Sequence, residues 1–491
     1  MKNLRFLVSV LLLCCAASMS FGDSMFFDAP NGAGTNPANW TEPTAWMDWN
    51  GSGNSFNRVP TASDNVFMLT WSGDPADDIC ILNSSATVNG LWIGYWGCAA
   101  TLNIEDGANL DITGQANIGY NGNAVVNQNG GAFTANSIRM GYDTSVATYN
   151  MNAGQLTSRP YGGFVVGTGS AGFADGSSTT FNQTGGTITT TGYAVGKAGT
   201  TGIHNMTGGS ITGLEYGGDF QIGAIGNRLT GSIRSEFNLG DAVGTGTIQM
   251  DDSSSLYIDH RNSMLRGWGI FNLGGAGTSA ARIFNSGVVK ADGYGIDRDL
   301  DLSQFNHVEI YDDENLNTGT NGWYAENHGR LLLPSIAVAS GNGSYNWGED
   351  YSADATYLVN SFRVAFTGAS AGNLDAALLA DDRSDVAAHD GLAFLAVWQM
   401  DQLAFANADI IFRFDDTKAA ALGIDESALN VYKLVNGAWA ALPGTLDSLN
   451  NKLTISTDSL GTFAIGGVIP EPTTIVILGI GAALLRRKRS S

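Results

Sequence analysis

The chain has 491 residues, 43% of them hydrophobic, and a formal net charge of −22. This length allows two or three domains, and the hydrophobic content excludes an intrinsically disordered protein. The 24 Lys and Arg residues are outnumbered by 46 Asp and Glu residues. This balance argues against nucleic acid as a partner, because phosphates are bound by clustered basic side chains.

The first 22 residues have the pattern of a secretory signal peptide. Lys2 and Arg5 precede an apolar stretch from Phe6 to Ala17, and small residues follow before Gly22. A membrane anchor is the alternative, but this apolar stretch is shorter than the roughly 20 residues that cross a bilayer. We therefore predict a signal peptide over residues 1–22 and export of the chain.

Residues 23–85 precede the repeats and are rich in Trp and turn residues. The first unit of a repeat array exposes unpaired strand edges, so this segment is predicted to be an N-terminal cap. The alternative is a sugar-binding platform, for which the candidates are Trp40, Trp46, Trp49 and Trp71.

Two cysteines, Cys80 and Cys98, remain after the predicted cleavage. In the oxidising compartment that export implies, they could form a disulfide. Two separate buried thiols agree with the sequence equally well, so both alternatives stay open.

Residues 86–345 contain a repeat with two interleaved markers. A short apolar element ends in a glycine, as in LWIGYWG and ANIGYNG, and a second element begins with an asparagine, as in NQNGGAFT and NMTGGSIT. The marker glycines are Gly94, Gly119, Gly141, Gly167, Gly196 and Gly223, and the marker asparagines are Asn103, Asn127, Asn150, Asn182 and Asn205. The elements alternate Thr, Ile and Val between turn residues, which is typical of β-strands.

A repeat this short cannot bury its own apolar face, so the units must stack. We predict a right-handed parallel β-solenoid over residues 86–345. The glycines are expected at corners with positive φ. The asparagines beside them are expected either to tolerate a left-handed backbone or to form a hydrogen-bonded ladder between coils. Insertions in the repeat, at residues 170–178 and 223–232, are expected to project from one side.

The composition changes near residue 350. Alternating strand patterns follow, and Asn436-Gly437 between two of them is a strong hairpin signal. The stretch TKAAALGIDES allows one short helix. Residues 350–467 are therefore predicted to form a small β-sandwich-like domain.

The last segment, residues 468–491, combines three features in a fixed order. A Pro-Glu-Pro triplet precedes an apolar run from Thr473 to Leu485 and a terminal basic cluster. The residues are Pro470, Glu471 and Pro472 in the triplet, and Arg486, Arg487, Lys488 and Arg489 in the cluster. The apolar run would be only about 20 Å long as a helix, against a hydrocarbon core of about 30 Å, so it would be a marginal permanent anchor.

This tail resembles the PEP-CTERM sorting signal of Gram-negative bacteria that have exopolysaccharide systems. The resemblance implies that exosortase, a membrane transpeptidase, recognises and removes the tail. It also implies that a short hydrophobic helix holds the precursor in the inner membrane transiently, with the basic cluster on the cytoplasmic side. The Gly-rich repeats are similar to those of autotransporter passengers and of PEP-CTERM surface proteins. A simple C-terminal anchor is the alternative.

Catalytic and metal-binding motifs are weak in this sequence. Adjacent acidic residues occur as pairs, but neighbours on a strand point to opposite faces and do not converge on a substrate. These pairs are Asp251-Asp252, Asp312-Asp313 and Asp415-Asp416, and a His-Gly pair occurs at His328-Gly329. The acidic run at Asp297, Asp299 and Asp301 begins like a calcium loop, but Leu302 stands where that loop needs glycine.

The sequence therefore predicts no catalytic residues, no metal site and no cofactor. We expect an exported structural or adhesion protein of the cell surface or extracellular matrix, with exosortase as a partner and exopolysaccharide as a candidate partner. The alternative is a β-helix protein that binds or degrades polysaccharide.

Overall fold

The computed structural model describes most of the chain between residues 23 and 468. The described ranges are 23–27, 37–48, 57–69, 79–142, 144–160, 162–168, 177–197, 200–214, 218–224, 234–259, 262–274, 281–310, 321–349, 358–389 and 391–468. The predicted signal peptide, the sorting residues Pro470 to Pro472, and the basic cluster Arg486 to Arg489 lie outside these ranges. Most of the two predicted loops at 170–178 and 223–232 lies outside them too.

The described chain is nearly all β, as predicted, and most of its strands belong to three parallel ladders. The first ladder has its own sheet, and all its pairings are parallel. Its strands are β2 (Ala38–Asn39), β5 (Ile79–Leu82), β8 (Ala99–Ile104), β10 (Asn123–Gln128), β12 (Val146–Met151), β15 (Ser178–Gln183), β18 (Thr201–Met206), β21 (Ser235–Leu239), β24 (Ser263–Gly267), β27 (Val288–Asp292) and β30 (Gly322–Glu326).

The second ladder follows the first along the chain. It uses the first halves of two long strands, β9 (Asn109–Tyr120) and β11 (Ala132–Tyr142). Its other strands are β6 (Ala86–Val88), β13 (Gln155–Ser158), β16 (Thr187–Thr189), β19 (Ser210–Leu214), β22 (Thr247–Asp251), β25 (Gly269–Gly274), β28 (Arg298–Asp301) and β31 (Gly329–Leu332).

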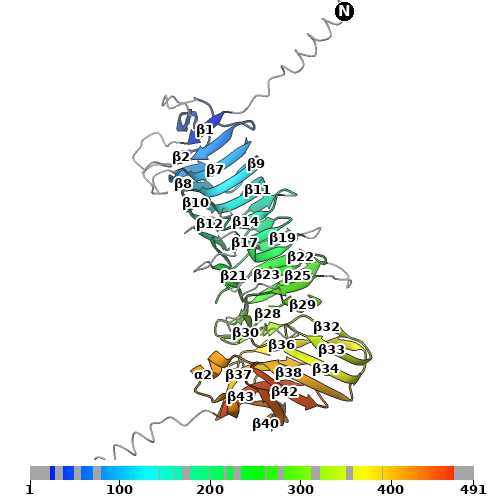
Figure 1. Ribbon diagram of the computed structural model, residues 1–491. Helices are drawn as coiled ribbons and strands as arrows, with labels where there is room; N and C mark the ends of the chain where they lie inside the picture. Colours follow the sequence, from blue (N-terminus) through cyan, green and yellow to red (C-terminus); the bar gives the residue numbers. More distant parts are fainter. Residues whose placement is uncertain are drawn as a thin grey trace, which may run out of the picture.

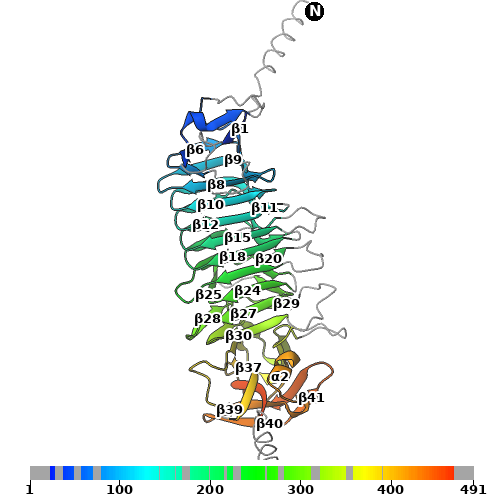
Figure 2. The same ribbon diagram turned by 90° about the vertical axis from the view of Figure 1, so that its left-hand side faces the viewer.

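The third ladder uses the second halves of β9 and β11. Its other strands are β1 (Ser24–Phe27), β4 (Asn65–Met68), β7 (Gly90–Tyr95), β14 (Phe164–Val166), β17 (Tyr193–Lys197), β20 (Phe220–Ala224), β23 (Leu256–Ile258), β26 (Arg282–Asn285) and β29 (His307–Ile310). We call three consecutive strands, one from each ladder, a rung. Each strand pairs with its counterpart in the next rung, so the rungs stack along one long axis (Figure 1, Figure 2).

Alternation along each strand produces the interior of the stack. In β10 and β18 every second side chain is buried and the others are partly exposed. The inward side chains of all three ladders belong to one continuous hydrophobic cluster. The repeat therefore buries a core that no single rung could form, since each rung covers the apolar face of its neighbour.

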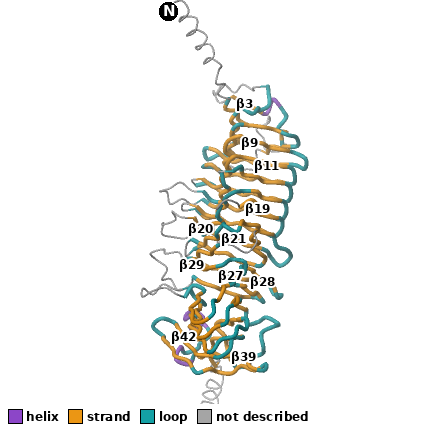
Figure 3. Tube along the Cα trace, turned by 90° about the vertical axis from the view of Figure 1, so that its right-hand side faces the viewer, coloured by secondary structure: helices purple, strands orange, loops and turns teal. Residues whose placement is uncertain are grey.

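The marker glycines lie at or next to the last residue of the strands of the third ladder. Loops and turns lead from the strands of one rung to those of the next (Figure 3). All six have positive φ, from 67° at Gly141 to 84° at Gly167, as expected for a left-handed corner. At Gly94 a side chain would also collide with the backbone at the start of β10. A Cβ built on Gly94 would lie 2.4 Å from the carbonyl oxygen of Asn123.

The marker asparagines form a hydrogen-bonded ladder on the outer face of the first ladder. Each side chain donates from Nδ2 to Oδ1 of the asparagine in the preceding rung, at 2.8 to 2.9 Å. The members are Asn103, Asn127, Asn150, Asn182, Asn205 and one residue that the sequence reading missed, Asn238. The expected asparagine ladder is confirmed, and it spans five successive rung-to-rung contacts.

Removing an interior member of this ladder should destabilise the chain more than removing its end. Asn150 makes two ladder hydrogen bonds and Asn103 makes one. At about 1 kcal/mol for each bond, Asn150→Ala should lower the free energy of unfolding by about 2 kcal/mol, and Asn103→Ala by about 1 kcal/mol. Urea titration followed by tryptophan fluorescence measures both values. Equal losses would show that the ladder bonds do not determine the effect.

The last rung passes directly into antiparallel structure. Strand β31 pairs antiparallel with β36, which begins a run of antiparallel strands. In order after β31 these are β36 (Ala376–Leu379), β37 (Leu392–Met400), β43 (Thr462–Val468), β39 (Asn430–Val435) and β40 (Ala438–Leu442). The turn between β39 and β40 is the predicted hairpin, with φ of 53° at Asn436 and 81° at Gly437.

A second antiparallel sheet packs against this run. Its five strands are β33 (Gly341–Asn346), β34 (Phe362–Ala369), β38 (Asn407–Arg413), β42 (Lys452–Thr457) and β41 (Gly444–Asp447). Aromatic side chains join the two sheets. The ring of Phe412 on β38 lies 4.7 Å from that of Trp398 on β37 and 5.8 Å from that of Phe463 on β43.

Short elements complete the C-terminal region. Strands β32 (Ile336–Val338) and β35 (Gly372–Leu374) form an antiparallel pair. The predicted short helix is α2 (Asp416–Ala421), which Asp415 caps by accepting a hydrogen bond from Lys418 N. A 3-10 turn, η2 (Glu426–Ala428), follows it.

The N-terminal segment lies at the other end of the stack. Strand β3 (Trp46–Asp48) pairs antiparallel with β1, after the 3-10 turn η1 (Pro43–Ala45). Trp40 and Trp46 are 2% and 0% exposed, and their rings are in edge contact. Their rings therefore belong to the core and cannot serve as a sugar platform. Trp49 and Trp71 lie outside the described residues.

Candidate functional site

Cys80 and Cys98 are both buried and form no disulfide with each other. Cys80 lies on β5 within the main core, whereas Cys98 packs with Phe26 and Leu69 in a separate small cluster. Burial raises the pKa of the Cys98 thiol. The arrangement corresponds to the second of the two alternatives drawn from the sequence, that of separate buried thiols.

The acidic pairs do not form a two-carboxylate site in the described residues. Asp251 accepts a hydrogen bond from Ser253 N in the turn after β22, and Asp252 beside it is partly exposed. Asp415 caps α2, and Asp416 begins that helix. Asp312 and Asp313 lie outside the described ranges. A glycosidase needs two carboxylates that face each other across the sugar, and these pairs do not provide that geometry.

The acidic run of β28 takes part in ion pairs and turns. Asp299 accepts from Arg330 Nε at 3.0 Å, and Asp301 accepts from Ser303 N at 2.9 Å. No group of three acidic, His or Cys side chains suited to a metal occurs within the described ranges. The calcium-loop interpretation therefore has no support in this part of the chain.

His328 lies beside Asp297 and Ser384, three residue types that also occur in hydrolase triads. His328 Nδ1 is 3.2 Å from Asp297 Oδ1, but the hydroxyl of Ser384 donates to Asp297 and not to the imidazole. A nucleophilic serine needs the histidine as its base, with the carboxylate behind the histidine. This order of contacts does not activate the serine.

Aromatic side chains form a column on the outer face of the third ladder. Tyr95, Tyr120 and Tyr142 each follow a marker glycine, and their rings stack at centroid distances of 5.5 Å and 4.7 Å. Stacked rings cover one another's faces, whereas a sugar packs against an exposed ring face. We therefore interpret this column as a stabilising contact between rungs.

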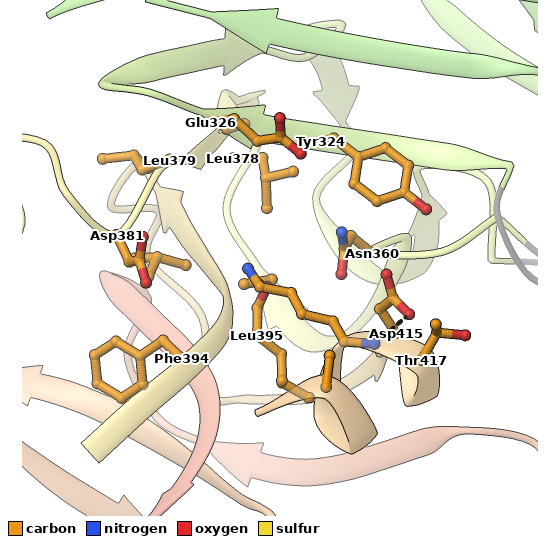
Figure 4. Close-up of a pocket in the computed structure, with 15 residues that line it drawn as sticks. Tyr324, Glu326, Asn360, Leu378, Leu379, Asp381, Phe394, Leu395, Asp415 and Thr417 are labelled. Carbon is orange, nitrogen blue, oxygen red and sulfur yellow. Dashed lines mark hydrogen bonds between the residues drawn. The ribbon is translucent and has the colours of Figure 1, made fainter. Parts of the chain in front are cut away.

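A pocket lies where the stack meets the C-terminal region. Its volume is 340 Å³, and strands β30, β36 and β37 line it together with helix α2. Figure 4 shows Tyr324 and Glu326 of β30 on one side, with Asp415 and Thr417 at the beginning of α2 on the other. Phe394 and Leu395 of β37 supply part of the apolar wall.

Buried polar groups form the floor of this pocket. Asp415 is 9% exposed and Asn360 is 4% exposed. Asn360 donates from Nδ2 to the carbonyl of Trp323 at 2.8 Å, but its buried Oδ1 accepts no hydrogen bond within the described chain. A buried acceptor without a donor is unfavourable, so this atom points to a ligand or a water as its partner.

Charged side chains of both signs line the pocket. Lys418 Nζ donates to the carbonyl of Leu395 at 2.7 Å, and Glu326 at the rim pairs with Lys290 at 3.0 Å. Asp381 is exposed at the rim. Burial, together with the charges of Asp415 and Glu326, raises the pKa of Tyr324, so its hydroxyl stays protonated.

The sequence did not predict this pocket. In the sequence, Asp415 is only half of an acidic pair, and the other lining residues carry no motif. They come from segments as distant as Glu326 and Lys418, and only the pairing of β31 with β36 brings them together.

One histidine is part of the core. His204 on β18 is fully buried, and its Nδ1 is hydrogen-bonded to the hydroxyl of Tyr193. Burial lowers the pKa of His204 to about 3. The other described histidines, His307, His328 and His389, are at least partly exposed, and His260 lies outside the described residues.

This buried histidine should make stability fall in mild acid. Below its ordinary pKa of about 6.5 the unfolded chain binds a proton that folded His204 rejects, so the free energy of unfolding decreases as the pH falls from 7 toward 3. At about pH 5 the loss is about 2 kcal/mol. Unfolding of wild type and His204→Gln at about pH 7.5 and pH 5 measures it, and the variant should lack this loss. His307→Gln, at an exposed position, should keep it; identical pH profiles for wild type and His204→Gln would contradict the prediction.

No family model, no curated protein and no solved structure matches this chain. Within the described residues, no helix is both long and apolar enough to cross a membrane. The apolar run from Thr473 to Leu485 lies outside the part of the chain to which this finding applies.

Proposed function

We propose that this chain is an exported surface or matrix protein whose stacked rungs serve as a rigid spacer or adhesive rod. In this interpretation the three ladders are the faces of a right-handed parallel β-solenoid, and the C-terminal sheets form a sandwich-like domain at its base. The observation that supports this proposal is the asparagine ladder, in which outward-facing side chains form hydrogen bonds with one another from rung to rung.

A side-chain ladder supports a mechanical role more than a catalytic one. The side-chain amides of the ladder form hydrogen bonds with one another. These bonds strengthen the contact between rungs and fix their register. A catalytic face would instead direct several polar groups of different chemistry at one point. The described faces of the stack show regular repetition, and the two described acidic pairs, Asp251-Asp252 and Asp415-Asp416, do not converge on one point.

The proposed location of the protein depends on two sequence features, the signal-peptide pattern and the tail at residues 468–491. We propose that the signal peptide directs export, and that residues 468–491 hold the precursor in the inner membrane through a short hydrophobic helix. Exosortase would then cut at the Pro470-Glu471-Pro472 motif and release the protein to the cell surface or the extracellular matrix. Exopolysaccharide is the partner that this destination suggests.

The C-terminus of the mature protein tests the sorting step. Protein recovered from the native envelope should lack a C-terminal peptide containing Arg486 to Arg489, as read by mass spectrometry of the terminal peptide. Glu471→Ala should leave the basic cluster in place, whereas Asp458→Asn, outside the motif, should be processed normally. A mature wild-type protein that still carries the basic cluster would refute sorting by cleavage.

The second candidate function is polysaccharide binding. The observation that favours it is the pocket below the last rung, with its buried polar floor and its apolar wall. Cleavage of polysaccharide has no comparable support, because the two described acidic pairs lie on different elements, one at the end of β22 and the other at the start of α2. New reducing ends after incubation with a panel of polysaccharides would reverse that conclusion.

A further inference from the structure

We propose that the pocket between β30, β36, β37 and α2 binds an amino sugar unit, a ligand that carries both an ammonium group and several hydroxyl groups. This inference is independent of the sorting and surface roles, because it depends only on described residues. Four properties of the pocket support it: its charge, its excess of acceptors, its size and its wall.

The charge of the lining favours a cation. Three carboxylates, of Glu326, Asp381 and Asp415, line the pocket with one ammonium group, of Lys418. Glu326 is paired with Lys290, but neither Asp381 nor Asp415 forms an ion pair with another described residue. A buried carboxylate such as Asp415 is stabilised by a positive partner, so an anionic ligand is disfavoured here.

The hydrogen-bonding groups favour a ligand that donates. The carboxylates of Asp415 and Glu326 and the unsatisfied Oδ1 of Asn360 are acceptors. The ammonium of Lys418 already donates to the carbonyl of Leu395. Hydroxyl and ammonium groups of a ligand supply the missing donors, whereas a purely apolar ligand would leave buried acceptors unpaired.

The volume of the pocket and its apolar wall favour a ligand with one small ring. At 340 Å³ the pocket is near the lower end of small-molecule sites, which span about 300 to 1,000 Å³. Phe394, Leu378 and Leu395 line it beside the polar floor (Figure 4). A sugar ring has an apolar C–H face and a polar edge, which matches a site with one apolar wall and several convergent polar groups.

Calorimetric titration of the full chain with D-glucosamine, at a pH where its amine is protonated, tests the proposal. Wild type should bind glucosamine. Asp415→Asn should lower the affinity for glucosamine at least about tenfold, because a charge-assisted contact is lost. Asparagine also caps helices, so this variant should keep α2 folded. Glu326→Gln, at the rim, should weaken binding without any effect on folding. Asp416→Asn changes the neighbouring carboxylate outside the lining and should bind as wild type does.

Two further ligands separate the parts of the proposal. D-Glucose has the hydroxyls without the amine, and ethanolamine has the amine without the ring; each should bind at least about tenfold more weakly than glucosamine. Equal binding of glucose would overturn the role of the ammonium, and equal binding of ethanolamine would overturn the sugar. Absence of glucosamine binding up to about 10 mM, or equal binding by Asp415→Asn and Asp416→Asn, would overturn the site.

Discussion

Gly94→Ala is expected to lower the free energy of unfolding by about 3 kcal/mol or more. Gly94 has a φ of 68°, a conformation that costs an L residue about 1 to 2 kcal/mol. The added Cβ would also lie 2.4 Å from the carbonyl oxygen of Asn123, which is a backbone atom at the start of β10 and cannot rotate away. Relieving this overlap must shift the stack locally, at a further cost of about 1 to 3 kcal/mol.

Gly97, three residues further on, provides the matched control. Its φ is 74°, but a Cβ there would meet no atom within 4 Å. Gly97→Ala should therefore cost only about 1 kcal/mol, from the backbone conformation alone. Urea unfolding of both variants measures the difference. Equal losses at the two positions would show that the contact with β10 adds nothing to the cost of Gly94→Ala.

Trp398→Ala should destabilise the C-terminal region by about 4 kcal/mol. The Trp398 side chain is fully buried between the two antiparallel sheets, packs on Phe412, and donates from Nε1 to the carbonyl of Asn360 at 3.2 Å. Truncation removes the packing, leaves a cavity and leaves that carbonyl without this donor. Thermal unfolding followed by circular dichroism should show an earlier transition.

Trp96 is the control for this variant, because it is 51% exposed. Trp96→Ala loses a ring that stacks on Tyr95 at the surface, and should cost less than about 1 kcal/mol. A loss for Trp398→Ala no larger than that for Trp96→Ala would show that the two sheets do not depend on this contact.

The sequence predicted the elements that depend on a neighbour one repeat away. The glycine at the end of each LWIGYWG-type element was expected to turn a corner, and all six marker glycines have positive φ. The marker asparagines were expected either to tolerate a left-handed backbone or to bond to their counterparts, and the structure shows the bonds. Such contacts recur with the period of the sequence, so their partners can be read from the spacing alone. Asn238 was missed because the repeat loses its other marker near that point.

Other predictions were incomplete for a different reason. The Trp residues of the N-terminal segment allowed either a core or a surface role, and only packing places Trp40 and Trp46 inside. The two cysteines could have paired, and only their positions in separate hydrophobic clusters distinguish the alternatives. Composition states which side chains are present, but burial depends on what the rest of the chain places beside them.

By itself the sequence determined an all-β chain with a short repeat, its corner glycines and its asparagine ladder. It also carries the tail that the sorting hypothesis depends on, with Pro470, Glu471 and Pro472 before a basic cluster. Only the tertiary structure decided how the last rung ends and what lies beneath it. Antiparallel pairing of β31 with β36 brings Glu326, Asn360 and Asp415 around one pocket. Contacts between adjacent repeats follow from local periodicity, whereas a site assembled from distant segments depends on strand pairing that no local pattern specifies.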